Sequence, residues 1–265
     1  MPEVLAKPDL LLYDGSFEGF LSAVFEATRS RLGEVRIVAR ARYRPGLLDA
    51  VREVDSWAEY AQRVWLGIEV RGGTELAAMV HGAFLSELEG IETVLWQYLR
   101  KLFADPSGAF GRNVLDEHVH AVFAAAQKVQ HEAHRFQGLV RFAAASDGSL
   151  FAVIAPEHNI LERLAPHFCS RFPNEAWMIA DSRRGLCLRH QAGEIQLLSC
   201  DPSVLPRNAP EVAGLASPED ESFRALWLAY YDAVNIRERA NPRLLARLLP
   251  RKYWKYLPER APRMA

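Results

Sequence analysis

The sequence lacks the features of a membrane protein and of a disulfide-rich secreted protein. The apolar run Leu10–Leu12 is far too short to span a bilayer or to act as a signal segment. Three cysteines, Cys169, Cys187 and Cys200, occur in 265 residues, and no C-x-x-C pair is present. This pattern argues against a disulfide framework, a zinc ribbon and a cysteine-ligated iron–sulfur cluster. We therefore expect a cytoplasmic protein with reduced thiols and no membrane contact.

The chain also lacks a large net charge of either sign. Its formal net charge is −1 and its isoelectric point is near 6.7. A field over the whole surface will therefore not attract nucleic acid, and any site for a polyanion must be a local patch. The remaining composition, with 49% hydrophobic and 25% charged residues, is that of an ordinary globular protein.

Established cofactor, metal and nucleophile motifs are absent as well. The sequence contains no G-x-G-x-x-G, no Walker loop and no G-x-S-x-G. His131 and His134 in "HEAHR" are three residues apart, whereas the metalloprotease motif needs four. His118 and His120 are two apart and point away from each other on a helix. The sequence therefore predicts no metal and no cofactor.

The hydrophobic periodicity predicts an α+β protein. Residues 1–133 are expected to be mostly helical with one or two short strands. The predicted strands are 10–13 and 50–54, and the predicted helices are 17–30, 56–68, 74–88, 91–104 and 112–133. Asp14 and Ser16 lie where the first helix starts and are expected to cap it. The free N–H groups of this turn could instead hold a phosphate, although the acidic Asp14 and Glu18 would repel it.

Residues 134–200 change to a strand-like pattern. The predicted strands are 138–145, 150–155, 176–181, 185–190 and 194–199, with one helix at 159–170. This order predicts an antiparallel sheet with a helix on one face. A linker at 201–218 and a helical, basic segment at 219–265 are expected to follow, with helices at 219–234 and 242–248. We expect these regions to pack as one compact unit.

Basic and aromatic residues occur together in the second half of the chain. They are Arg135, Phe136, Arg141, Arg171, Arg183 and Arg184. Guanidinium groups bind phosphate through a planar fork, and aromatic faces stack on unpaired bases. Arginines at helix ends and hairpins are equally typical of a solvated surface. Since Arg141 and Phe142 are neighbours in a predicted strand, both cannot lie on one binding face.

The charge of the chain is unevenly distributed. Residues 236–263 carry two acids and the nine cations Arg237, Arg239, Arg243, Arg247, Arg251, Lys252, Lys255, Arg260 and Arg263. This segment therefore has a charge of +7 and the rest of the chain −8. Such asymmetry is typical of proteins with a polyanion or an acidic partner. Within it, "LPRKYWKYLPE" (249–259) holds the aromatic residues Tyr253, Trp254 and Tyr256, which are expected to dock the segment on the domain, to stack on bases, or both.

Five ordered blocks of the sequence resemble a known family. They are "YDGSFEGFLSAVFEA" (13–27), "FLSELEGIETVLWQYLR" (84–100), "EAHRFQGLVRF" (132–142), "APHFCSRFP" (165–173) followed by "DSRRG", and "NPRLLARLLPRKYWKYLPE" (241–259). Together they resemble a bacterial family of proteins of DNA metabolism or DNA repair without an assigned activity. The resemblance implies an operon neighbour, a radical S-adenosylmethionine (SAM) protein with a helix-hairpin-helix. In some members a similar domain is fused to a uracil-DNA glycosylase-like domain.

The resemblance favours a DNA-binding accessory subunit of that radical SAM partner. The predicted DNA contacts are Arg135, Phe136, Arg141, Arg171, Arg183, Arg184, Arg251, Lys252, Tyr253, Trp254 and Lys255. One alternative is an enzyme with glycosylase-like or nuclease-like activity on nucleic acid. Its acid–base groups would come from Asp14, Glu18, Glu87, His134, Glu157 and His167. Another alternative is a protein-interaction module whose basic segment binds an acidic partner and no nucleic acid.

Overall fold

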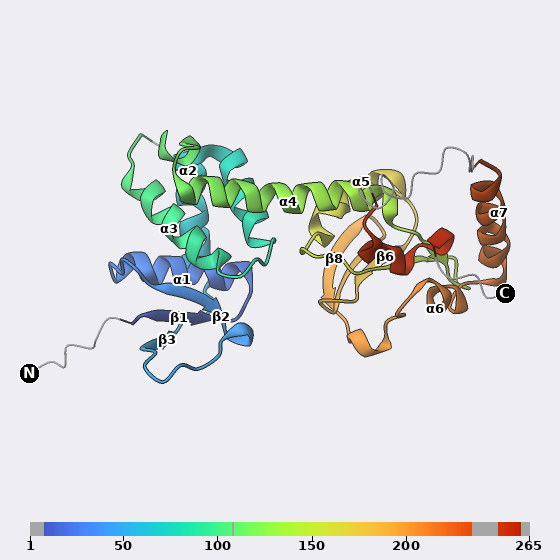
Figure 1. Ribbon diagram of the computed structural model, residues 1–265, viewed down its shortest axis with the longest axis horizontal. Coiled ribbons are helices and arrows are strands. Elements are labelled where there is room, and N and C mark those ends of the chain that lie inside the picture. The colour runs from blue at the N-terminus through green and yellow to red at the C-terminus, as the bar shows by residue number, and fades with distance from the viewer. Residues whose placement is uncertain (1–7, 108, 235–248, 261–265) are drawn as a thin grey trace, which may run out of the picture. The chain divides into compact units, whose positions relative to one another are not determined.

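The computed structural model describes residues 8–107, 109–234 and 249–260 and shows an α+β protein, as predicted (Figure 1). The chain divides into two compact units, an N-terminal unit up to Gln130 and a C-terminal unit from His131 onward. Among the described residues, none of the helices combines the length and the apolar character that crossing a membrane requires. The predicted helix at 242–248 lies outside the described residues, as do Arg237, Arg239, Arg243, Arg247 and Arg263.

The N-terminal unit contains a parallel sheet of three strands in the order β2-β1-β3. They are β1 (Leu10–Tyr13), β2 (Arg36–Ala39) and β3 (Val51–Glu53). Every residue of β1 is buried, as expected for the central strand of a parallel sheet covered on both faces. β1 and β3 were predicted, whereas β2 was not. Its sequence, RIVA, is short and follows a turn without a strong boundary signal.

Four helices carry the rest of this unit's core. They are α1 (Phe17–Arg29), α2 (Ala58–Phe84), α3 (Ile91–Ala104) and α4 (Glu117–Leu139), the last of which continues into the C-terminal unit. Ser16 caps α1 by accepting the N–H of Gly19, which confirms the predicted helix start. The predicted helices 56–68 and 74–88 form the single element α2 with a break at Gly73, where φ is 78°. A positive φ suits glycine because it has no Cβ.

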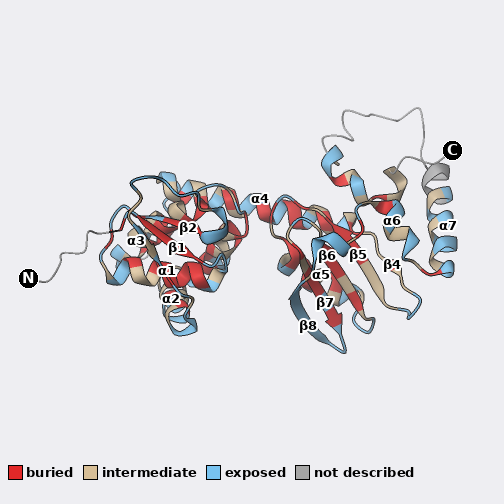
Figure 2. Ribbon diagram, turned by 90° about the horizontal axis from the view of Figure 1, so that it is seen from below, coloured by how far each residue is buried: buried red, intermediate tan, exposed pale blue. Residues whose placement is uncertain are grey.

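The C-terminal unit is built on a five-stranded sheet in the order β4-β5-β6-β7-β8. Its strands are β4 (Ala143–Ala144), β5 (Leu150–Ile154), β6 (Trp177–Asp181), β7 (Leu186–Gln191) and β8 (Glu194–Ser199). The prediction of a purely antiparallel sheet is wrong, because β5 and β6 pair in parallel. Helix α5 (Leu161–Arg171) connects them, and parallel neighbours need such a crossover. Figure 2 shows β8 as an exposed edge beside the more buried β7.

The segment after the sheet is more structured than a linker. Residues 201–218 include a 3₁₀ turn, η3 (Pro202–Val204), and a short helix, α6 (Ala209–Gly214), capped by Asn208. Helix α7 (Pro218–Val234) follows, close to the predicted 219–234. The described chain resumes at Leu249 and forms two 3₁₀ helices, η5 (Arg251–Tyr256) and η6 (Pro258–Arg260).

Candidate nucleic-acid interface

The basic, aromatic stretch "RKYWKY" is the 3₁₀ helix η5 (Arg251–Tyr256). A 3₁₀ helix has three residues per turn, so residues i and i+3 lie on the same side. The pair Lys-Tyr in "RKYWKY" also recurs after three residues. Tyr253 and Tyr256 therefore share one side of η5, Lys252 and Lys255 share a second, and Arg251 and Trp254 share the third.

The tyrosine side fixes η5 to the C-terminal unit. The Tyr253 hydroxyl donates to Oε1 of Glu132 at 2.7 Å, and its ring forms a T-shaped pair with Phe136, with centroids 5.0 Å apart. The hydroxyl of Tyr256 lies 2.9 Å from Oγ of Ser182 and donates to the carbonyl of Pro206 at 3.1 Å. Both tyrosines are therefore anchors, which confirms that aromatic side chains dock this segment.

Glu132 is the buried acceptor that organises the anchor. Only 3% of the residue is exposed, and besides Tyr253 it accepts the backbone N–H groups of Glu157 and His158 at 2.8 and 2.7 Å. Burial, followed by the hydrogen bond to this carboxylate, raises the pKa of Tyr253. Tyr253 therefore stays protonated and keeps donating at neutral pH. Sequence reasoning missed Glu132, because a single acid inside a helix gives no signal of its distant partners.

The lysine side of η5 faces solvent. Lys252 and Lys255 are exposed, and Nζ of Lys252 pairs with Oε2 of Glu157 at 2.5 Å. The hydrogen bond from Lys252, against the opposing effect of desolvation, holds the pKa of Glu157 below its usual value. On the third side, the Arg251 guanidinium lies 5.8 Å from the ring centre of Trp254. The indole N–H of Trp254 donates to the carbonyl of Leu249 at 3.0 Å.

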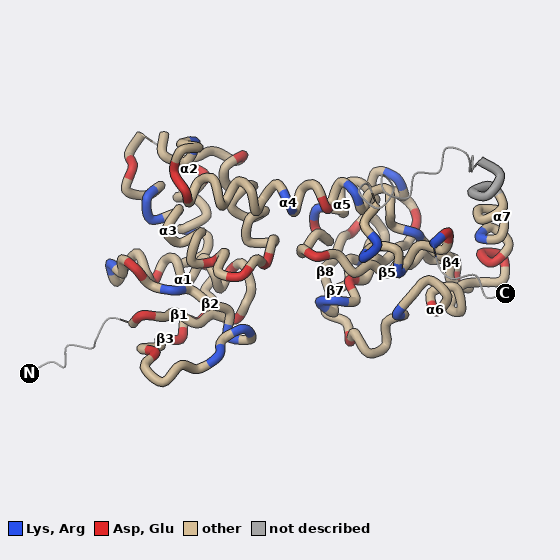
Figure 3. The backbone as a smooth tube through the Cα atoms, in the orientation of Figure 1, with Lys and Arg blue, Asp and Glu red and all other residues tan. Residues whose placement is uncertain are grey.

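Two further cations lie next to this helix. The guanidinium of Arg135, on α4, lies 5.6 Å from the Tyr253 ring centre. Arg183, at the tip of the β6–β7 hairpin, is exposed and donates to the carbonyl of Glu157 at 3.3 Å. We call the resulting group the basic surface (Lys and Arg are blue in Figure 3), and it consists of Arg135, Arg183, Arg251, Lys252 and Lys255.

Arg184 is a structural residue at the same hairpin. Its side chain is only 9% exposed and pairs with Oδ2 of the fully buried Asp181 at 2.7 Å. It also donates to the carbonyls of Pro156 and Glu157 at 3.3 and 2.6 Å. Burial raises the pKa of Asp181, and the charge of Arg184 acts against that rise. The structure therefore uses Arg184 to hold the loop before α5 rather than to present a charge to solvent.

Arg141 and Arg171 lie elsewhere in the C-terminal unit. Arg141 pairs with Oε1 of Glu259 at 2.8 Å, and its guanidinium lies 5.5 Å from the Trp227 ring centre. Arg171, at the end of α5, is exposed, and its guanidinium lies 5.5 Å from the ring centre of Phe172. These two predicted DNA contacts are therefore not part of the basic surface.

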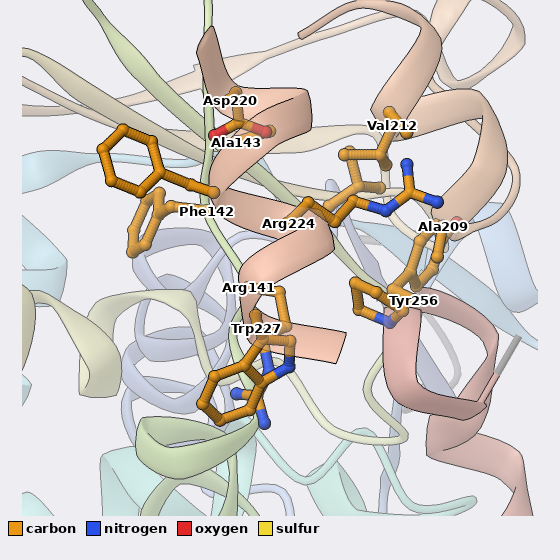
Figure 4. Close-up of a pocket in the computed structure, with 13 residues that line it drawn as sticks. Arg141, Phe142, Ala143, Ala209, Val212, Asp220, Arg224, Trp227 and Tyr256 are labelled. Atoms are coloured by element: carbon orange, nitrogen blue, oxygen red, sulfur yellow. The ribbon is translucent and has the colours of Figure 1, made fainter. Parts of the chain in front are cut away.

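A cavity of about 260 Å³ adjoins the anchor in the C-terminal unit. Tyr256 lines it together with residues of α6, α7 and the start of the sheet (Figure 4). Trp227 lies beside Arg141 in this view, and Arg224 extends toward Val212 and Ala209. Asp220 accepts the backbone N–H of Ala144 at 3.0 Å, which joins α7 to β4.

The six predicted acid–base residues are divided between the two units. Asp14 follows β1, Glu18 lies on α1 and Glu87 follows α2, whereas His134 lies on α4, Glu157 follows β5 and His167 lies on α5. Although desolvation opposes the effect, hydrogen bonds from Ser16 and Ser56 hold the pKa of Asp14 below its usual value. Asp14 and Glu157 are therefore ionised at neutral pH, and neither is suited to be a general acid.

Metal ligation has no support among the residues that the structure describes, where no group of three or more His, Cys, Asp or Glu side chains could hold an ion. A family model described as a domain of unknown function, DUF4130, matches residues 89–259. This range includes α3, the whole five-stranded sheet and η5. No protein of curated function matches the sequence.

Proposed function

This chain belongs to the DUF4130 family, and we propose that it is a cytoplasmic DNA-binding accessory protein of DNA repair or DNA metabolism that works with a radical SAM helix-hairpin-helix protein. The family description assigns no activity, so the proposal rests on the basic surface and on the sequence resemblance. The observation that carries it is the agreement between the period of "RKYWKY" and that of the 3₁₀ helix η5. This agreement directs the tyrosines inward and the lysines outward.

Phosphate is the part of DNA that this surface suits. Arg135, Arg183 and Arg251 offer planar donor forks. Lys252 and Lys255 offer point charges from residues about 6 Å apart along the axis of η5. Glu157, an acid at this surface, already has Lys252 as its partner. Several cations on a rigidly anchored helix cost less conformational entropy to order than the same cations on a free tail.

Base stacking contributes less in this proposal. Phe136 and Tyr253 are buried against each other, so they support the surface and do not reach a base. Trp254 is partly exposed, but the guanidinium groups of Arg251 and Arg260 lie 5.8 and 5.3 Å from its ring centre. We therefore expect binding that depends on phosphate contacts, with little sequence preference and a strong dependence on salt.

The alternative of an enzyme gains no specific support. It needs a pocket in which two of the predicted acid–base groups approach each other. Among the described residues that line the cavity next to Tyr256, none is one of those six groups. We therefore do not propose an activity.

The test is fluorescence anisotropy of the full chain with labelled single- and double-stranded oligonucleotides over a salt series. The variant replaces Arg251, Lys252 and Lys255 with Ala, and the matched control replaces Arg29, Arg36 and Arg40, three exposed cations of the N-terminal unit. We expect the slope of log K against log salt to flatten by about two to three units in the variant only. Each phosphate contact that is lost reduces the number of counterions that binding releases, and this number sets the slope.

Two results would reject the proposal. The first is the absence of binding to either oligonucleotide at low salt. The second is an equal loss of slope in the variant and in the control. If binding is absent while the protein still associates with an acidic partner protein, the protein-interaction alternative is supported instead.

A further inference from the structure

The β7–β8 hairpin brings two cysteines together. Cys187 pairs with Leu198 in the register of the two strands. Cys200 lies two residues beyond Leu198, on the same face of the sheet, and its N–H donates to the carbonyl of Gly185 at 2.8 Å. The two sulfur atoms are 2.6 Å apart. The spacing of 13 residues gave no sign of this contact in the sequence.

The local backbone permits this close approach. Gly185 has a φ of 64°, and a Cβ at this position would lie 2.6 Å from the carbonyl oxygen of Cys200. Only glycine therefore lets the end of β8 lie so close to the start of β7. The sulfur separation is about half an ångström longer than an S–S bond of about 2.05 Å. It is too short for a metal ion between the sulfurs, since zinc needs about 2.3 Å to each thiolate.

We propose that Cys187 and Cys200 are a covalent modification site, at which a low-molecular-weight disulfide such as oxidised glutathione converts the two thiols into a reversible intramolecular disulfide. Cys200 is partly exposed and is the sulfur that such a reagent can reach. Cys187 is only 3% exposed and is shielded by the sheet. The reduced thiols expected from the sequence are then one of two states of this pair, and the disulfide is the other.

The reaction balances in two exchange steps. The Cys200 thiolate attacks the S–S bond of the reagent, which forms a mixed disulfide and releases one thiolate. The Cys187 sulfur then attacks the Cys200 sulfur, and the second thiolate leaves and takes up the proton of Cys187. Two thiols of the protein are oxidised, and the one disulfide of the reagent is reduced to two thiols.

The order of the steps follows from the surroundings of each sulfur. Burial, followed by the contact with Cys200, raises the pKa of Cys187 to about 12. Cys187 is therefore a thiol at neutral pH and a poor first nucleophile. Once Cys200 is in a mixed disulfide, the part of the rise that comes from its thiol disappears. Cys187 can then resolve the mixed disulfide at short range.

The disulfide would lie in a small apolar cluster that also contacts Tyr256, one of the two tyrosines that anchor η5. Cys187 packs there with Val153 and Ala180, and Cys200 and Tyr256 pack against this group. Pro206, six residues after Cys200, accepts the hydrogen bond of the Tyr256 hydroxyl. The disulfide would therefore tie the segment that carries Pro206 to β7.

The experiment is a peptide map of the full chain after incubation with excess oxidised glutathione and alkylation of the remaining thiols. We expect a peptide that links Cys187 to Cys200 and that disappears after treatment with dithiothreitol. The control Cys169→Ser should give the same link, because Cys169 lies on α5. The variant Cys200→Ser should give none.

Three results would overturn the proposal. They are a stable glutathione adduct on Cys200 without a link, a link that includes Cys169, and links only between chains. The map of the unaltered protein decides among these results even if a serine variant fails to fold. Because no nucleic acid is present, failure here leaves the proposed DNA binding untouched.

Discussion

The hydroxyl of Tyr253 donates a 2.7 Å hydrogen bond to Glu132, a residue 121 positions earlier in the chain. The same carboxylate accepts two backbone N–H groups from the loop before α5. A buried carboxylate is stable only when its oxygens are hydrogen-bonded. This one contact therefore joins η5, α4 and the loop before α5, and it fixes where the exposed lysines of η5 lie.

Removal of this hydroxyl is expected to weaken the C-terminal unit. Tyr253→Phe keeps the ring against Phe136 but removes one donor from the buried Glu132, whose bonds to two backbone N–H groups remain. Hydrogen bonds to charged groups contribute about 1.5–3 kcal/mol, so we expect a loss of that size in the free energy of unfolding. Urea unfolding followed by circular dichroism measures it.

The matched control is Tyr60→Phe, in the N-terminal unit. Tyr60 stacks on Phe25 with ring centres 4.3 Å apart, and its substitution should change the free energy of unfolding by less than about 0.5 kcal/mol. If the two variants lose equal stability, the hydroxyl of Tyr253 is not an anchor.

Glu157→Gln is expected to strengthen DNA binding. The change removes the acid that pairs with Lys252 in the basic surface and keeps the shape of the side chain. Lys252 then interacts with phosphate without a competing carboxylate. We expect a severalfold rise in affinity at low salt, which anisotropy measures, with the difference shrinking as salt rises.

The control for this change is Glu194→Gln, on the exposed edge strand β8. It removes the same charge from the same unit but outside the basic surface. An equal gain in both variants would mean that only net charge matters, and a loss of affinity in Glu157→Gln would contradict the proposed surface.

Asp116 is expected to make the free energy of unfolding of the N-terminal unit fall as pH decreases in the acid range. Its carboxylate accepts the N–H of His118 at 2.9 Å at the start of α4 and pairs with Lys101 at 2.6 Å. Desolvation opposes the effect, but these contacts lower the pKa of Asp116. Its stabilisation is therefore present above the pKa of the unfolded state, about 3.9, and is lost as pH falls through the lower pKa of the folded state.

The variant Asp116→Asn tests this sign. Asn still caps a helix but carries no charge, so we expect a loss of about 1 kcal/mol at neutral pH. The difference from the unaltered protein should shrink as pH falls below about 3.9, the pKa of the unfolded state. Unfolding measured in urea at several pH values gives both quantities. Nδ1 of His118 lies 3.5 Å from Asp116 and 3.7 Å from Glu117, and both neighbours are unchanged in the variant. A difference that stays constant with pH would contradict the prediction.

Local sequence patterns were sufficient to predict the helices and strands that have both a clear hydrophobic pattern and a boundary residue. The buried strand Leu10–Tyr13 and the helix that Ser16 caps were predicted because apolar runs and cap residues act over a few positions. β2 was missed because its short apolar run is bounded by Arg36 and Arg40 and lacks the continuous leucine run of β1. The short β4 was overestimated because α4 continues to Leu139, into the predicted strand.

The parallel pairing of β5 and β6 was readable in principle. A strand, a helix and a strand follow one another at 150–181, and this order is typical of parallel neighbours. Pairing of strands is a long-range property, so the pattern of each strand alone does not determine it.

The candidate site was predicted only in part. Lys252, Lys255 and Arg183 are exposed cations, as the sequence suggested. Arg184 and Tyr253 were expected to contact DNA, yet their polar groups are used by Asp181 and Glu132. Whether a charge faces solvent or a buried partner depends on residues far away in the chain, and a basic cluster in the sequence cannot show it.

The three-residue period of η5 also limits how the length of this segment can vary. Deletion of one residue at the start of η5 would rotate every later side chain by a third of a turn, which would move Tyr256 to the position of Lys255 and Leu257 to that of Tyr256. Leu257, which cannot donate a hydrogen bond from its side chain, would then face the carbonyl of Pro206, and Tyr256 would face water. An insertion or deletion of three residues would therefore keep each later side chain on its side of η5, whereas a change of one or two residues would not.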